Sequence, residues 1–96
     1  MKEIKINKSR VIFYYDTRVV EFNTPHQKEL VNLTSLGTPF FRPGRSIDES
    51  CQYFFPINGR KPLVINDLGV NHQDSTKVLR NIEKHLNAMY RACANE

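Results

Sequence analysis

Several features that mark common functional classes are scarce or missing in this 96-residue sequence. It contains no tryptophan, two cysteines and four glycines. Cys51 and Cys93 lie far apart, so the paired cysteines of zinc fingers and thioredoxin-type enzymes are missing. The glycines are scattered along the chain, which excludes a glycine-rich phosphate-binding loop. We therefore expect no metal, no cofactor and two buried thiols rather than a disulfide scaffold.

Long apolar runs are missing as well. No segment approaches the roughly 18 apolar residues of a membrane-spanning helix, and the opening stretch, MKEIKINKSR, lacks the apolar centre of a secretory signal. These two absences predict a cytoplasmic chain without a membrane contact. At this length one hydrophobic core is expected, so residues 1–96 are predicted to form a single domain.

Charged residues are present in an ordinary amount, with an excess of one sign. Fourteen Lys and Arg against ten Asp and Glu give a net charge of +4, and charged residues make up 25% of the chain. That fraction is typical of a folded domain. The positive sign favours partners that carry phosphate or other acidic groups, although proteins without such partners can have the same balance.

The first part of the chain has the pattern of an antiparallel meander of three strands, in the segments EIKI, RVIFYYD and RVVEFN. In the second segment, alternation puts Val11 and Phe13 on one face and Ile12 and Tyr14 on the other. Both faces are apolar or aromatic. This strand is therefore either covered on both sides, or it presents Ile12 and Tyr14 to a protein partner or a second copy of the chain.

Two more elements are expected before the C-terminal region. Thr24, followed by a glutamine three residues later, forms a capping-box pattern that predicts a helix over about residues 25–36. Asn58-Gly59 stands between the apolar runs of CQYFFPINGRKPLVI, which is the strongest short signal for a hairpin. Prolines in both runs suggest that this 51–65 hairpin lies at a sheet edge, where it could also pair with a partner.

The clearest element is an amphipathic helix that reaches to about residue 94. Its apolar residues recur at alternating spacings of three and four: Leu79, Ile82, Leu86, Met89 and Cys93. The order of elements predicts an α+β fold. In this fold an antiparallel sheet, made of the N-terminal meander and the later Asn-Gly hairpin, packs with two helices, of which the C-terminal one is long and amphipathic.

Basic residues occupy the side of this helix opposite its apolar stripe. At about 100° per residue, the following positions fall together: Lys77, Arg80, Lys84 and Arg91. No acidic residue lies among them, although solvated helices usually mix charges there. A row of one sign about 20 Å long suits a phosphate backbone. The alternative is an ordinary solvent-facing side whose basic residues complement the helix dipole.

A second basic group lies in the loops. Arg42 and Arg45 flank Pro43-Gly44, and Arg60-Lys61 follows the Asn58-Gly59 turn. Aromatic rings beside basic residues are what single-stranded nucleic acid needs, because rings stack on bases while cations hold phosphates. Phe40 and Phe41 are the candidate stacking residues. The alternative is that these phenylalanines, with the aromatic residues of the hairpin, belong to the core.

Histidines give little support to catalysis. His26, His72 and His85 show no metal-ligand spacing, and a nucleophilic pair of Cys51 with His72 would depend on the fold. A small endoribonuclease is the enzymatic alternative, because it would need only basic residues, a tyrosine or histidine and a groove. We assign no catalytic residue.

Two functional hypotheses remain. The first is a small, basic, regulatory protein that binds DNA or RNA through the basic helix face and the basic loops. The second is a protein-interaction module, for example a small inhibitor or adaptor from a mobile genetic element, or a homodimer that acts through its sheet.

Overall fold

The computed structural model describes residues 2–6, 8–42, 51–67 and 72–94. Within these ranges the chain forms seven strands, one 3-10 turn and one α-helix. In chain order their bounds are β1 Lys2–Ile6, β2 Ser9–Tyr14, β3 Val19–Asn23, β4 Lys28–Asn32, η1 Leu33–Ser35, β5 Phe40–Arg42, β6 Cys51–Ile57, β7 Arg60–Asp67 and α1 His72–Ala94.

Strands β1 to β4 form one antiparallel sheet in which each strand pairs with the next. Alternation within β2 points Val11 and Phe13 into the core, where both are completely buried. Ile12 lies on the outer face between Glu3 and Glu21 of the flanking strands, and it is 7% exposed. Because β4 pairs with β3, the N-terminal meander has four strands, one more than the sequence predicted.

Strands β5, β6 and β7 form a second antiparallel sheet, with β6 in the centre. Along β6, buried residues alternate with half-buried ones, so Tyr53 and Phe55 face the core while Phe54 faces outward. The register shifts at Pro56, which has no backbone N–H to donate. Between β6 and β7, Gly59 adopts a positive φ of 81°, a conformation that a side chain would strain.

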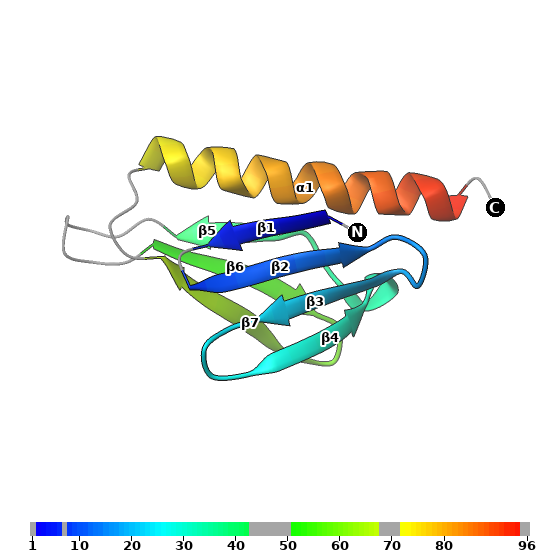
Figure 1. The fold of residues 1–96 in the computed structure, drawn as a ribbon, viewed down its shortest axis with the longest axis horizontal. Helices are drawn as coiled ribbons and strands as arrows, with labels where there is room; N and C mark the ends of the chain where they lie inside the picture. Colours follow the sequence, from blue (N-terminus) through cyan, green and yellow to red (C-terminus); the bar gives the residue numbers. More distant parts are fainter. Residues whose placement is uncertain (1, 7, 43–50, 68–71, 95–96) are drawn as a thin grey trace.

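The fold is α+β: the two sheets pack face to face, and α1 runs along one side of them (Figure 1). The core between the sheets includes Phe22 and Phe55, whose ring centroids lie 4.8 Å apart. The helix contacts β1 and β5, which are the edge strands of their sheets. It therefore covers the side on which both sheets end.

Helix α1 is held by its apolar stripe and by side-chain hydrogen bonds of Tyr90 and His85. Ile82, Leu86 and Met89 are buried in the shared core, and each contributes about 1.5–3 kcal/mol relative to an exposed position. Tyr90 donates its hydroxyl to the Leu36 carbonyl at 3.0 Å, and His85 is hydrogen-bonded to the hydroxyl of Tyr15 at 3.0 Å. No helix of the described residues has both the length and the apolar character needed to cross a membrane.

The predicted helix over residues 25–36 is wrong, because this segment forms strand β4 and the short η1 turn. Thr24 makes the hydrogen bonds expected of a cap, but they close a turn: its Oγ1 accepts from the Gln27 N–H at 3.1 Å, and its own N–H donates to the Gln27 carbonyl at 2.8 Å. After this turn the chain pairs with β3, whose other edge is already bonded to β2. Leu30 consequently points outward, 62% exposed, while Leu33 is buried.

Candidate nucleic-acid interface

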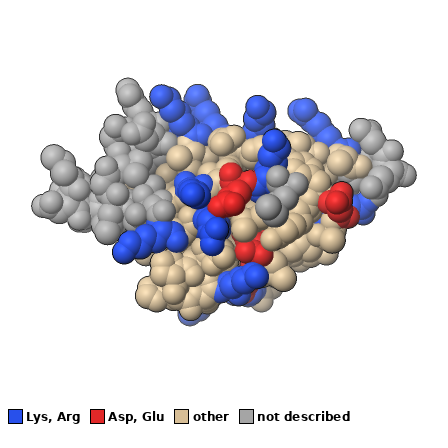
Figure 2. Space-filling view, in the orientation of Figure 1, with Lys and Arg blue, Asp and Glu red and all other residues tan. Residues whose placement is uncertain are grey.

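The outer side of α1 carries the four cations that the sequence singled out. With about 100° between successive residues, these residues fall within an arc of about 60° opposite the buried stripe: Lys77, Arg80, Lys84 and Arg91. All four side chains are exposed, and the row is about 21 Å long. Figure 2 shows basic side chains projecting along the margin that α1 occupies in Figure 1.

No acidic side chain of the described residues forms an ion pair with these four cations. Basic residues of the sheets, in contrast, have acidic partners: Arg10 lies 3.6 Å from Glu3, and Lys28 lies 3.7 Å from Glu21. Between Lys77 and Arg91 the one acidic residue is Glu83. Within the described side chains of α1, no ion pair compensates the positive potential of the row.

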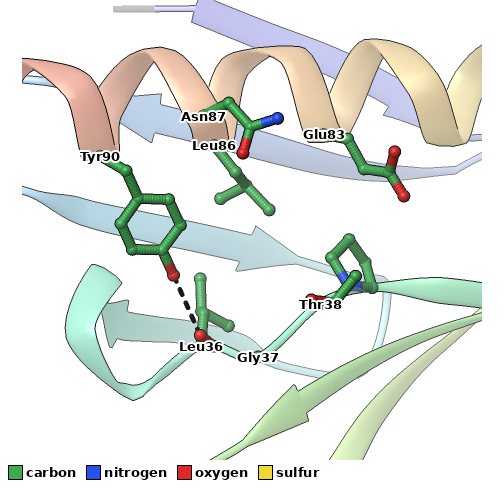
Figure 3. A pocket seen from close by; sticks show the side chains of 8 residues that line it. Leu36, Gly37, Thr38, Glu83, Leu86, Asn87 and Tyr90 are labelled. Carbon is green, nitrogen blue, oxygen red and sulfur yellow. Dashed lines mark hydrogen bonds between the residues drawn. The ribbon is translucent and has the colours of Figure 1, made fainter.

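A groove of about 370 Å³ runs beside the row, between α1 and the segment that leads into β5 (Figure 3). Its lining consists of Leu36, Gly37, Thr38, Pro39, Glu83, Leu86, Asn87 and Tyr90. Tyr90 and Glu83 stand toward opposite ends of this groove in Figure 3. Because the Glu83 carboxylate would repel a phosphate, the groove is unsuited to hold one, and the exposed side of α1 is the better phosphate site.

The loop cations do not form one group. Arg42 is exposed on β5, opposite Gln52 of β6, whereas Arg60 is opposite Ile57, at the other end of β6. Arg60 forms an ion pair with Glu29 of β4, so its charge is partly compensated. Lys61 is exposed beside it. Arg45 lies outside the described residues.

The two candidate stacking residues point to opposite faces of β5, because successive strand residues alternate. Phe41 packs against the core, with its ring centroid 6.4 Å from that of Tyr53. Phe40 is 49% exposed and stacks on Phe54, with centroids 4.9 Å apart and planes 10° from parallel. Of the two, Phe40 alone offers an exposed ring at the surface.

From the sequence, the aromatic residues of the hairpin were considered only as candidate core residues, and Val64 was not considered. Cross-strand pairing places Phe40, Phe54 and Val64 in one row across the outer face of the three-stranded sheet. The alternation along CQYFFPI could have shown this orientation, because Phe54 stands between Tyr53 and Phe55 and so points to the opposite face of the strand. Neighbouring aromatic residues in a strand cannot all face the core.

The residues considered for catalysis are spread over the fold. Cys51 is buried at the start of β6, and His26 is exposed in the turn before β4. Burial lowers the pKa of His85 below its ordinary value of 6.5, and the positive charges of Lys2 and Lys84 lower it further. The side chains of His72 and Cys93 lie outside the described part. Within that part, no cluster of three His, Cys, Asp or Glu side chains could hold a metal ion.

These positions leave the outer side of α1 and the outer face of β5–β7 as the two surfaces of unusual composition. Comparison with protein-family models, with curated proteins and with solved structures finds no match for this chain.

Proposed function

We propose that this chain is a small, basic, regulatory protein that binds DNA or RNA by contacting phosphates with the outer side of α1. The supporting observation is the row of four exposed cations without an acidic partner among the described residues. Each contact to a phosphate releases condensed counterions, which favours binding and makes it sensitive to salt. Arg42, on the strand next to the helix, adds a further exposed cation.

Phosphate contacts position a protein on nucleic acid without reading its sequence. The apolar stripe of α1 is buried against both sheets, so its outer side is what remains for a ligand. Its cations are accompanied by the exposed amide of Asn81. We expect the four cations to supply affinity through phosphates, and a preference for unpaired bases to come from the sheet next to the helix.

The outer face of the four-stranded sheet is a poorer phosphate site. Glu21 is 4% exposed there, where it accepts a hydrogen bond of 3.0 Å from the Tyr14 hydroxyl and lies near Lys28. Acidic and basic side chains are interspersed over this face in Figure 2. Its charges compensate one another, so it does not attract a polyanion as the helix row does.

Charge reversal on the helix tests the proposal. Lys84→Glu with Arg91→Glu should abolish binding to short labelled oligonucleotides in fluorescence anisotropy, because two contacts are lost and two repulsions are gained. Lys5→Glu with Lys28→Glu changes the net charge by the same amount at exposed positions on the outer face of the four-stranded sheet, and this control should retain binding. If the helix variant keeps its fold by circular dichroism and binds as tightly as the control, the proposal is wrong.

A protein-interaction module that acts through its sheet, as an inhibitor, an adaptor or a homodimer, is the second candidate. The exposed Leu30 on β4, the last strand of its sheet, favours it. Ile12, at 7% exposure, offers less surface to such a partner, and Tyr14 is engaged with Glu21. A mass of two chains in size-exclusion light scattering would support this candidate, and a mass of one chain at high concentration would oppose the homodimer.

A further inference from the structure

The outer face of the three-stranded sheet carries an apolar row that crosses all of its strands. Phe40 of β5, Phe54 of β6 and Val64 of β7 lie directly opposite one another. Phe40 is 49% exposed and Val64 is 38% exposed, and the two phenyl rings are stacked nearly in parallel. Exposed aromatic rings on a regular strand are unusual, because burial of such side chains is strongly favourable.

The row is accompanied by hydrogen-bonding groups and a cation. Two residues further along each strand, on the same face, a second cross-strand row consists of Arg42 of β5, Gln52 of β6 and Asn66 of β7. Gln52 donates from Nε2 to Asn66 Oδ1 at 3.2 Å, which leaves the second N–H of the Gln52 amide and the N–H groups of Asn66 able to donate to a ligand.

The charges of the two outer faces differ. On the three-stranded sheet, Arg42 is an exposed cation in the row with Gln52 and Asn66, whereas Arg60 is paired with Glu29 of β4. The four-stranded sheet instead places Glu3 and Glu21 on its outer face, each near a cation. A ligand that complements flat apolar rings, amide donors and the exposed cation Arg42 is both aromatic and anionic.

We infer that the outer face of β5–β7 is a stacking platform for single-stranded nucleic acid. An unpaired base stacks on Phe40, Arg42 holds an adjacent phosphate, and the Gln52 and Asn66 amides face the edge of a base. This inference rests on the proposed function and deepens it by naming the class of nucleic acid. A duplex cannot use the platform, because its bases already stack on one another.

The position of β5 connects the platform to the basic row. Strand β5 is the strand of its sheet that contacts α1, so Phe40 and Arg42 lie at the border between the two surfaces. A strand whose phosphates lie along α1 can continue onto β5 and turn its bases toward the sheet. The helix then supplies salt-sensitive affinity, and the platform supplies the preference for unpaired bases.

The test compares two substitutions at one position. Phe40→Leu keeps an apolar side chain but removes the ring, whereas Phe40→Tyr keeps the ring. Binding is measured by anisotropy on a labelled single strand of about twelve nucleotides and on its duplex, because this length covers one sheet face. Leu30→Ala, a change at an exposed apolar residue of the other sheet, is the matched control.

Phe40→Leu should weaken binding of the single strand by about 5- to 150-fold, the range expected for one stacked base, and leave the duplex unchanged. Phe40→Tyr and Leu30→Ala should bind both like the unaltered protein. If Phe40→Leu binds single strands normally while Lys84→Glu with Arg91→Glu does not, the platform is wrong and the proposed function stands. If the unaltered protein binds no strand at low salt, both are wrong.

A second measurement uses the unaltered protein and does not depend on any variant. Single strands that carry 5-iodouracil cross-link on irradiation to the aromatic side chains on which the base lies. Mass spectrometry should locate the cross-link at Phe40 or Phe54. Cross-links confined to other residues would overturn the inference. It would also be overturned if Phe40→Leu lost self-association in light scattering while its binding of single strands stayed unchanged.

Discussion

The number of phosphate contacts made by α1 can be counted from the salt dependence of binding. Each neutralised phosphate contributes about −0.7 to the slope of log K against log salt for a single strand. Four contacts from the exposed row predict a slope of about −2.8. Replacing Lys84 and Arg91 by alanine removes two contacts, so the slope should become about −1.4.

The affinities follow from these slopes. Raising NaCl from about 50 to about 200 mM should weaken the unaltered protein by about 50-fold and the double alanine variant by about 7-fold. A further contact from Arg42 would steepen both slopes equally, so the difference between them depends on the two substitutions alone. Fluorescence anisotropy with one labelled single strand at four or more salt concentrations gives both slopes.

The control is the double variant Lys5→Ala with Lys28→Ala, which removes the same charge from exposed positions on the outer face of the four-stranded sheet. It should keep the slope of the unaltered protein, because residues that touch no phosphate release no counterions. Equal slopes for the helix variant and the unaltered protein would refute the assignment of these contacts to α1. A slope reduced as much in the control would show that net charge matters rather than the row.

Two predictions concern the packing of the helix. Ile82→Ala should lower the free energy of unfolding by about 2–5 kcal/mol in urea titrations, because Ile82 is completely buried. Asn81→Ala, at the exposed neighbouring position, should change this free energy little, and equal effects of the two substitutions would contradict the packing. The second prediction concerns pH: burial and the charges of Lys2 and Lys84 lower the pKa of His85 in the folded state, so the unfolded chain takes up a proton first and stability falls as the pH drops below 6.5. The urea midpoint should therefore fall more between about pH 7.5 and about pH 5.5 in the unaltered protein than in His85→Gln, and an identical fall in both would contradict this account.

Local patterns in the sequence predicted the elements whose structure is decided locally. The C-terminal helix has a strong period, and the structure buries its stripe at Ile82, Leu86 and Met89 as that period requires. The antiparallel α+β class also followed from the order of the segments. The error at residues 25–36 arose because Thr24 and Gln27 make similar hydrogen bonds in a turn and in a helix cap. The segment becomes a strand because β3 offers an edge with which it can pair, and the residues around Thr24 give no sign of this edge.

For the candidate site as well, the sequence predicted the features that local geometry decides and missed those that depend on distant strands. The common face of Lys77, Arg80, Lys84 and Arg91 follows from helix geometry alone, so the sequence sufficed to find it. The ion pair of Arg60 joins two distant strands, and nothing near Arg60 in the sequence points to Glu29. Sequence-level reading could not orient Phe40 and Phe41, because β5 is three residues long and neither neighbouring pattern sets its parity.

The placement of α1 also bears on aggregation. Because it covers β1 and β5, the unpaired backbone groups of the described sheets are left on β4 and β7, at the far side of the fold. Lys28 on β4 and Pro62 on β7 make these strands poor templates for a further strand. If α1 detaches, the edges of β1 and β5 become accessible as well, so the docking of this helix limits how readily the chain forms intermolecular sheets.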